Sequence, residues 1–141
     1  MKNFSDIKLN ENIAKSLDEL GFISPTPIQS KTIPLLLDTK QDLIGAAQTG
    51  TGKTAAFSLP LLEAVSDYPS ELTTALILTP TRELAVQIAE SIEDYGKYLP
   101  LRSTVIFGGV KINPQIAKLR AGVDILVATP GRLLDHIRQK R

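Results

Sequence analysis

The sequence predicts an α/β fold in which a mostly parallel sheet carries helices on both faces. Two observations support this. Short apolar runs without polar alternation are separated by segments of helical periodicity, as in strands that are covered on both sides. A glycine-rich loop also stands between the first apolar run and a helical segment. The expected strands are residues 42–46, 75–78, 104–107 and 125–128.

Helices are expected where a capping residue precedes apolar residues at helical spacing. Asn10 is expected to cap a first helix that stops at Gly21. Thr26-Pro27 pairs a cap with proline at the first helical position, which predicts a short helix to Thr32 and a separate turn over residues 34–37. The remaining helices are expected at residues 53–65, 82–95 and 113–120 and from Pro130 onward.

A proline inside the expected helix at residues 53–65 predicts a distortion of that helix. Pro60 lies inside residues 53–65 and lacks the N–H that a helix interior requires. We therefore expect the helix to kink or split there.

Length and composition predict one globular domain or a large piece of one. The chain has 141 residues, 43% of them hydrophobic and 22% charged. It contains no cysteine and one histidine, which excludes a disulfide framework, a Cys/His zinc site and a cysteine nucleophile. That histidine, His136, is expected at the surface without a role. No signal-like or membrane-spanning apolar stretch is present, so we expect a cytoplasmic protein.

Charge is distributed unevenly along the chain. The formal net charge is only +1, but residues 101–141 hold 8 Lys/Arg against 2 Asp/Glu, whereas residues 1–100 hold 8 against 13. A basic surface for nucleic acid is one interpretation, and solvated helix faces are the other.

The glycine-rich loop has the pattern of a phosphate-binding loop. It reads Ala47-Gln48-Thr49-Gly50-Thr51-Gly52-Lys53-Thr54, with Ala47 in place of the usual first glycine. Glycines let the backbone N–H groups turn inward around phosphate oxygens, and Lys53 adds a positive charge. The Thr54 hydroxyl is placed to bind Mg²⁺, and the helix that follows adds its positive N-terminal end. The loop predicts binding of a nucleoside triphosphate, with Lys53 and Thr54 as candidate catalytic residues.

Other groups needed for hydrolysis are not evident in the sequence. An acidic residue at the end of a neighbouring strand would hold Mg²⁺ through water. The apolar runs before Asp38 and Asp135 match in letters only, since one lacks β-branched residues and the other is helical in pattern. No arginine-finger candidate stands out either.

Five motifs in order resemble those of DEAD-box RNA helicases. Residues 21–29 (Gly-Phe-Ile-Ser-Pro-Thr-Pro-Ile-Gln), with Phe4 lying 17 residues before Gly21, are similar to the Q motif, and residues 47–54 to motif I. Pro80-Thr81-Arg82-Glu83-Leu84-Ala85 is similar to motif Ia, Gly108-Gly109 to the GG motif and Thr129-Pro130-Gly131-Arg132 to motif Ib. The sequence of residues 47–57 is similar to that of bacterial members of the family.

The resemblance implies a RecA-like P-loop domain that is truncated. Residues 1–33 would be a Q-motif helical region and residues 34–141 a partial N-terminal RecA-like domain. The Asp-Glu-Ala-Asp sequence that names the family would lie beyond Arg141, as would the second RecA-like domain with its arginine fingers. The chain by itself is therefore expected to be catalytically inactive.

The resemblance also implies roles for individual residues. ATP would be held by the amide of Gln29 on adenine, by Phe4 stacking on the base, by Phe22, and by residues 47–54 on the phosphates, with Mg²⁺ on Thr54. The sugar–phosphate backbone of single-stranded or duplex RNA would be contacted without base reading by Pro80, Thr81, Arg82, Gly108, Gly109, Thr129, Gly131 and Arg132. In the complete protein, ATP would close two RecA-like domains over RNA and separate short duplexes.

Each motif alone has a simpler interpretation. The two phenylalanines could be core residues, and Gln29 a solvated polar residue on a helix. Thr81 and Thr129 could be helix caps, and Gly108-Gly109 a turn. Two other functions stay open, namely another P-loop phosphotransferase, such as a small-molecule kinase, and a non-catalytic nucleotide- or RNA-binding module.

Overall fold

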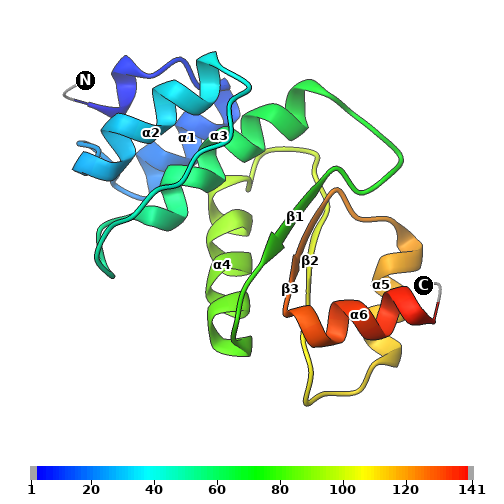
Figure 1. Cartoon of the computed structure of the whole chain (residues 1–141). Coiled ribbons are helices and arrows are strands. Elements are labelled where there is room, and N and C mark those ends of the chain that lie inside the picture. Colours follow the sequence, from blue (N-terminus) through cyan, green and yellow to red (C-terminus); the bar gives the residue numbers. More distant parts are fainter. Residues whose placement is uncertain (1–2, 140–141) are drawn as a thin grey trace. The chain divides into compact units, whose positions relative to one another are not determined.

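The computed structural model describes residues 3–139 (Figure 1). Its elements, in chain order, are the 3-10 helix η1 (Phe4–Asp6), α1 (Glu11–Glu19), α2 (Pro27–Asp38), α3 (Lys53–Asp67), β1 (Ala75–Leu78), α4 (Arg82–Tyr95), β2 (Ser103–Ile106), α5 (Asn113–Ala121), β3 (Ile125–Ala128) and α6 (Pro130–Arg138). The chain divides into two compact units, residues 1–67 with 94–99 and residues 68–93 with 100–141, of which residues 3–139 are described.

The first unit is helical. α2 packs against α3, and Ile13, Leu17, Ile33, Leu59 and Leu62 are buried in its core. The expected cap of α1 is confirmed, because the Asn10 side chain accepts a hydrogen bond from the Asn12 N–H at 2.8 Å. Helix–helix packing, rather than a sheet, therefore stabilises this unit.

The second unit contains the sheet. Its three strands are all parallel in the order β1-β3-β2, with Ala75 and Ser103 both opposite Ile125. The central strand β3 is buried along its whole length. Leu119 of α5 and Leu133 of α6 pack against Ile106 and Leu126, while α4 lies on the other side of the sheet (Figure 1). The prediction of a parallel sheet with helices on both faces is confirmed for this unit.

The predicted strand at residues 42–46 is wrong. These residues have no regular secondary structure, and Ile44 is 99% exposed. A strand forms only where a neighbour supplies hydrogen bonds, and within residues 3–139 the sheet consists of β1, β3 and β2 alone. The apolar letters alone could not reveal that this run has no partner.

The helix break predicted before Pro34 and the split predicted at Pro60 are wrong, and the kink at Pro60 stays a prediction. Residues 27–38 form one helix that continues through Pro34, not two short ones, and α3 continues through Pro60 without splitting. Each proline removes only one backbone hydrogen bond, whereas the adjacent Ile33 and Leu59 are fully buried. Burial of the apolar face outweighs the lost bond. No helix within the described residues is both long and apolar enough to cross a bilayer.

Candidate functional site

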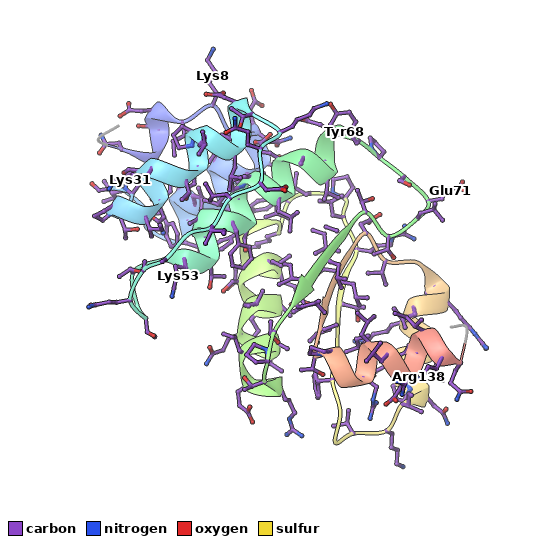
Figure 2. The ribbon with its side chains drawn as sticks, in the orientation of Figure 1. Lys8, Lys31, Lys53, Tyr68, Glu71 and Arg138 are labelled. Atoms are coloured by element: carbon purple, nitrogen blue, oxygen red, sulfur yellow. The ribbon has the colours of Figure 1, made fainter. Side chains whose placement is uncertain are left out.

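The glycine-rich loop of the first unit leads directly into α3. Gly50 and Gly52 both have φ of 84°, a left-handed conformation that only glycine adopts without strain. The Thr51 hydroxyl donates to the Gln48 carbonyl at 2.6 Å, and Lys53 Nζ donates to the Ala47 carbonyl at 2.6 Å. Lys53 is exposed at the first position of α3, which Figure 2 labels. A lysine, a glycine turn and a helix N-terminus therefore lie within one short segment, as an anion site requires.

A buried glutamine holds this loop. Gln29, 4% exposed, donates from Nε2 to the Gly52 carbonyl at 3.1 Å, and its Oε1 accepts from the Thr26 N–H at 2.9 Å. Beside it, the Thr26 hydroxyl donates to the Thr51 carbonyl at 2.7 Å. A Cβ added at Gly52 would collide with Gln29 Nε2. The solvated-residue interpretation of Gln29 is wrong, because its amide joins α2 to the phosphate loop.

Phe4 and Phe22 belong to an aromatic cluster in the same unit. Their ring centroids lie 5.5 Å apart, and the Phe22 ring lies 5.7 Å from that of Tyr95. Phe4 is only 7% exposed, as the simpler core interpretation expects. A surface hollow of about 710 Å³ beside Phe4 and Phe22 is lined by described residues that include neither Gln29 nor the phosphate loop. Stacking of Phe4 on adenine therefore stays a prediction.

Thr54 lies in the first turn of α3 with a half-buried side chain. Among residues 3–139, no cluster of three or more His, Cys, Asp or Glu side chains is arranged to hold a metal ion. A hydroxyl beside a phosphate loop fits a Mg²⁺ ion whose other ligands are phosphate oxygens and water. The role of Thr54 in metal binding stays a prediction.

The second unit brings the other three motifs to one edge of its sheet. Residues 80–82, 108–109 and 129–132 follow the carboxyl ends of β1, β2 and β3. These ends are tied by backbone bonds from the Thr79 N–H to the Ala128 carbonyl at 2.9 Å and from the Thr129 N–H to the Ile106 carbonyl at 3.1 Å. Ligands of open parallel sheets bind at this edge. The edge is a candidate nucleic-acid interface.

Arg82 and the glycine turn lie next to each other at this edge. The Arg82 guanidinium lies 5.5 Å from the centroid of the Phe107 ring. Gly109 has φ of 81°, and a Cβ there would lie 3.4 Å from Arg82 Nη1. The Thr81 hydroxyl accepts from the Leu84 N–H at 3.2 Å, so its cap interpretation is confirmed. The exposed Arg82 is thus placed beside the Gly108-Gly109 turn.

Arg132 points inward, unlike Arg82. Its side chain is 11% exposed, and it donates from Nη1 to Gln115 Oε1 at 3.1 Å and from Nη2 to the Val110 carbonyl at 3.0 Å. Its Nε lies 3.9 Å from an oxygen of Asp135. The guanidinium therefore holds residues of its own unit, which the sequence does not predict.

Gln115 and His136 take positions that the sequence pattern did not indicate. Gln115 received no role, yet it is 7% exposed and donates from Nε2 to the Phe107 carbonyl at 3.0 Å. The surface position expected for His136 is wrong, because it is 2% exposed with Nε2 at 3.2 Å from Gln115 Oε1. His136 lies one helical turn after Leu133, which packs on the sheet, and this spacing was the signal available.

The arrangement defines an α/β protein of the RecA-like P-loop class. A family model described as DEAD/DEAH box helicase matches residues 26–141, and the chain belongs to this family. It is 49% identical over 140 residues to "ATP-dependent RNA helicase CshA" of Listeria monocytogenes, covering 99% of the chain and 26% of the relative. It is 48% identical over 136 residues to "ATP-dependent rRNA helicase rrp3" of Sclerotinia sclerotiorum, covering 96% of the chain and 28% of the relative.

Solved structures agree with this assignment. A DEAD box protein from the hyperthermophile Methanococcus jannaschii superposes with a TM-score of 0.90 at 44% identity, over 99% of this chain and 38% of that one. A hypothetical ATP-dependent RNA helicase from Sulfolobus tokodaii gives a TM-score of 0.84 at 42% identity, over 94% of this chain and 37% of that one. The chain spans about a quarter of the length of the curated relatives that it matches.

Proposed function

We propose that this chain is the ATP-binding and RNA-contacting part of an ATP-dependent RNA helicase. The observation that carries the proposal is the buried amide of Gln29, which clasps a glycine-rich loop at the N-terminus of α3. Because that loop suits phosphate and the amide suits a purine edge, one site combines the two recognitions that ATP requires. The names of the relatives, which include ATP-dependent RNA helicases, support the same conclusion.

The amide of Gln29 has groups left for a base. A carboxamide carries two N–H donors and two acceptor lone pairs, and each end of Gln29 uses one of them within the protein. Adenine offers an amino donor next to the N7 acceptor, whereas guanine offers two acceptors at the same edge. A donor beside an acceptor therefore matches adenine and leaves one mismatch with guanine.

The phosphate end is recognised by charge and by backbone N–H groups. Lys53 would neutralise β- and γ-phosphate oxygens, residues 47–52 would donate from their backbone, and Thr54 would bind Mg²⁺. The ion would shield the charge that develops on the transferred phosphate. Phe4 and Phe22 would lie on the base side of the site.

The RNA end is recognised through the backbone of the nucleic acid. Hydroxyls, glycine N–H groups and the exposed Arg82 suit phosphates and carry no base reading, which favours binding without sequence preference. In the whole protein, a second RecA-like domain would close over ATP and RNA and strain the bound strand, so that short duplexes separate. A chain without cysteine fits a cytoplasmic location for this activity.

The proposal is tested by the nucleotide selectivity of Gln29→Ala. Calorimetric titration of ATP and GTP should show that the variant loses about 1–3 kcal/mol of binding free energy for ATP and much less for GTP, because only adenine uses the amide fully. A small-molecule kinase with a separate base pocket would instead be indifferent to this change.

Two controls separate base reading from loosening of the loop. Thr26→Ala removes the bond to the Thr51 carbonyl and the capping bond from the Gln29 N–H but keeps the side-chain amide of Gln29, so ATP and GTP should weaken equally. Gln41→Ala, at an exposed position outside the loop, should change neither. Equal loss of ATP and GTP in Gln29→Ala would contradict the proposal.

A further inference from the structure

We propose that Gln115 is the positioning residue that sets the Gly108-Gly109 turn and the Arg132 guanidinium in one arrangement, so that a side chain which RNA does not touch controls the grip on RNA. The inference rests on the proposed function only in its last step. Its structural part concerns the turn itself and stands on the contacts within the second unit.

The contacts of Gln115 converge on both flanks of the turn. Its Nε2 donates to the carbonyl of Phe107, the residue before Gly108, at 3.0 Å. Its Oε1 accepts from Arg132 Nη1 at 3.1 Å, and Arg132 Nη2 donates to the carbonyl of Val110, the residue after Gly109, at 3.0 Å. One amide and one guanidinium thus hold the turn from both ends.

Burial gives these bonds their strength. Gln115 is 7% exposed and the Arg132 side chain 11%, so water competes little for the bonds of the Gln115 amide, whereas the bond from Arg132 to the Val110 carbonyl is exposed. An unpaired amide or guanidinium in this place would be costly, which disfavours other arrangements. The buried His136 also approaches the same Gln115 oxygen with Nε2 at 3.2 Å.

The clamp formed by Gln115 and Arg132 uses the carbonyl oxygens that flank the turn and none of its N–H groups. Both bonds end on the carbonyls of Phe107 and Val110, so the clamp does not consume the backbone donors of Gly108 and Gly109. Gly109 lies beside the exposed Arg82, since a Cβ added at Gly109 would be 3.4 Å from Arg82 Nη1. The Phe107 carbonyl shares its peptide plane with the Gly108 N–H, so the bond from Gln115 also fixes the direction of that donor.

This assignment changes the expected role of Arg132. Its guanidinium is engaged with Gln115 and Val110, so we assign its effect on RNA to the shape of the turn rather than to contact with a phosphate. Arg82, which is exposed, is assigned the direct contact. The contributions of the two arginines to RNA binding should then differ in their dependence on salt.

The test compares Gln115→Leu and Gln115→Glu with the matched control Gln87→Leu, which lies on α4. Leucine keeps roughly the same volume and removes the polar contacts of the amide with Phe107, Arg132 and His136. Glutamate keeps an acceptor for Arg132 and loses the donor to Phe107. Amide hydrogen exchange and NMR shifts of residues 108–110 and of Arg132 Nε report the turn without any ligand. Fluorescence anisotropy of a labelled uridine decamer reports binding over a range of salt.

Gln115→Leu should shift the resonances of the turn and of Arg132 Nε and weaken decamer binding by about three- to tenfold at temperatures well below its unfolding midpoint. The slope of log K against log salt should become shallower by about 0.7 for each phosphate that the variant no longer binds, which a merely less stable protein would not show. Gln115→Glu should keep the Arg132 signal and still shift Gly108. Gln87→Leu should leave all of these unchanged.

Two outcomes would overturn the inference. Unchanged turn and Arg132 signals in Gln115→Leu would show that Gln115 does not position them. Shifted signals with unchanged decamer affinity and salt slope would show that the turn does not control binding. If the parent chain itself binds no decamer, the proposed RNA contact fails instead, and the ligand-free signals still decide whether Gln115 sets the turn.

Discussion

The two units each contain a glycine loop that a buried glutamine holds, but they hold it differently. Gln29 donates to the Gly52 carbonyl and accepts from the neutral backbone N–H of Thr26, which lies three residues earlier at the cap of the same helix. Gln115 donates to the Phe107 carbonyl and accepts from the charged Arg132 of a different helix. Charge-assisted bonds are about twice as strong as neutral ones.

The segments before the two loops also differ in how firmly they are held. The phosphate loop follows residues 39–46, which have no regular structure and leave Ile44 exposed, whereas the Gly108-Gly109 turn follows the paired strand β2. The phosphate loop is therefore the softer of the two. A loop that wraps around a triphosphate benefits from this freedom, and a turn that presents fixed donors to a polymer backbone benefits from being held.

The largest effect is expected from Lys53→Ala, which changes one loop only. The side chain offers the one ammonium in the phosphate loop, so its loss should weaken ATP binding about 100-fold in calorimetric titration. RNA affinity should stay unchanged, because the other loop belongs to the other unit. Equal loss of ATP and RNA binding would show that the two loops are not independent.

Lys53→Ala also serves as the control in a test of ATP hydrolysis by this chain. We expect no appreciable RNA-stimulated ATP hydrolysis by this chain, because the sequence offers no convincing carboxylate at a strand end to hold Mg²⁺ through water and no arginine finger. The measurement is phosphate release with and without RNA. Robust release that Lys53→Ala abolishes would refute the expectation, and release that persists in the variant would indicate a contaminant.

Local signals predicted the elements that depend on local interactions. The Asn10 cap, the Thr26-Pro27 start of α2 and the strands β1 and β3 are confirmed, because capping bonds and short apolar runs are determined within a few residues. The strand at 42–46 is wrong because pairing depends on a distant neighbour. The continuity of α2 through Pro34 depends on packing against α3 in the same way.

The candidate sites follow the same division. The phosphate loop could be read from residues 47–54 alone, since its glycines and lysine are adjacent in sequence. The burial of Gln115 could not, because it is explained by a contact with Arg132, 17 positions away on another helix. A polar residue that joins a turn to a distant helix has no sequence pattern of its own.

A smaller effect is expected when the softer loop is strained. Gly52→Ala must adopt φ near 84° and must also displace Gln29 from its bonds, whereas Gly50→Ala has the same φ but nothing within 4 Å of its Cβ. We expect a loss of about 1 kcal/mol in unfolding free energy for Gly50→Ala and about 2–3 kcal/mol for Gly52→Ala in urea unfolding. Equal losses would show that Gln29 yields without cost.

The smallest effects are expected from pH, with opposite signs in the two units. Burial raises the pKa of Glu63, which accepts a hydrogen bond from the Asn10 N–H in the first unit. The hydrogen bonds from Arg102 lower the pKa of Asp124 in the second unit. Glu63 therefore makes the first unit less stable as pH rises from about 4.5 through its raised pKa. Asp124 stabilises the second unit above about 3.8, and this contribution is lost as pH falls through its lowered pKa.

Glu63→Gln and Asp124→Asn separate the two contributions in urea unfolding between pH 3 and 7. Glu63→Gln should remove the fall in unfolding free energy that Glu63 causes as pH rises. This change should be under about 1 kcal/mol, because solvent screens a half-buried carboxyl. Asp124→Asn should cost about 1–2 kcal/mol at neutral pH, since it weakens the bonds to Arg102, and the cost should shrink on acidification. If both variants changed stability with the same sign of pH dependence, the two carboxyl groups would not be in the opposite environments that the structure gives them.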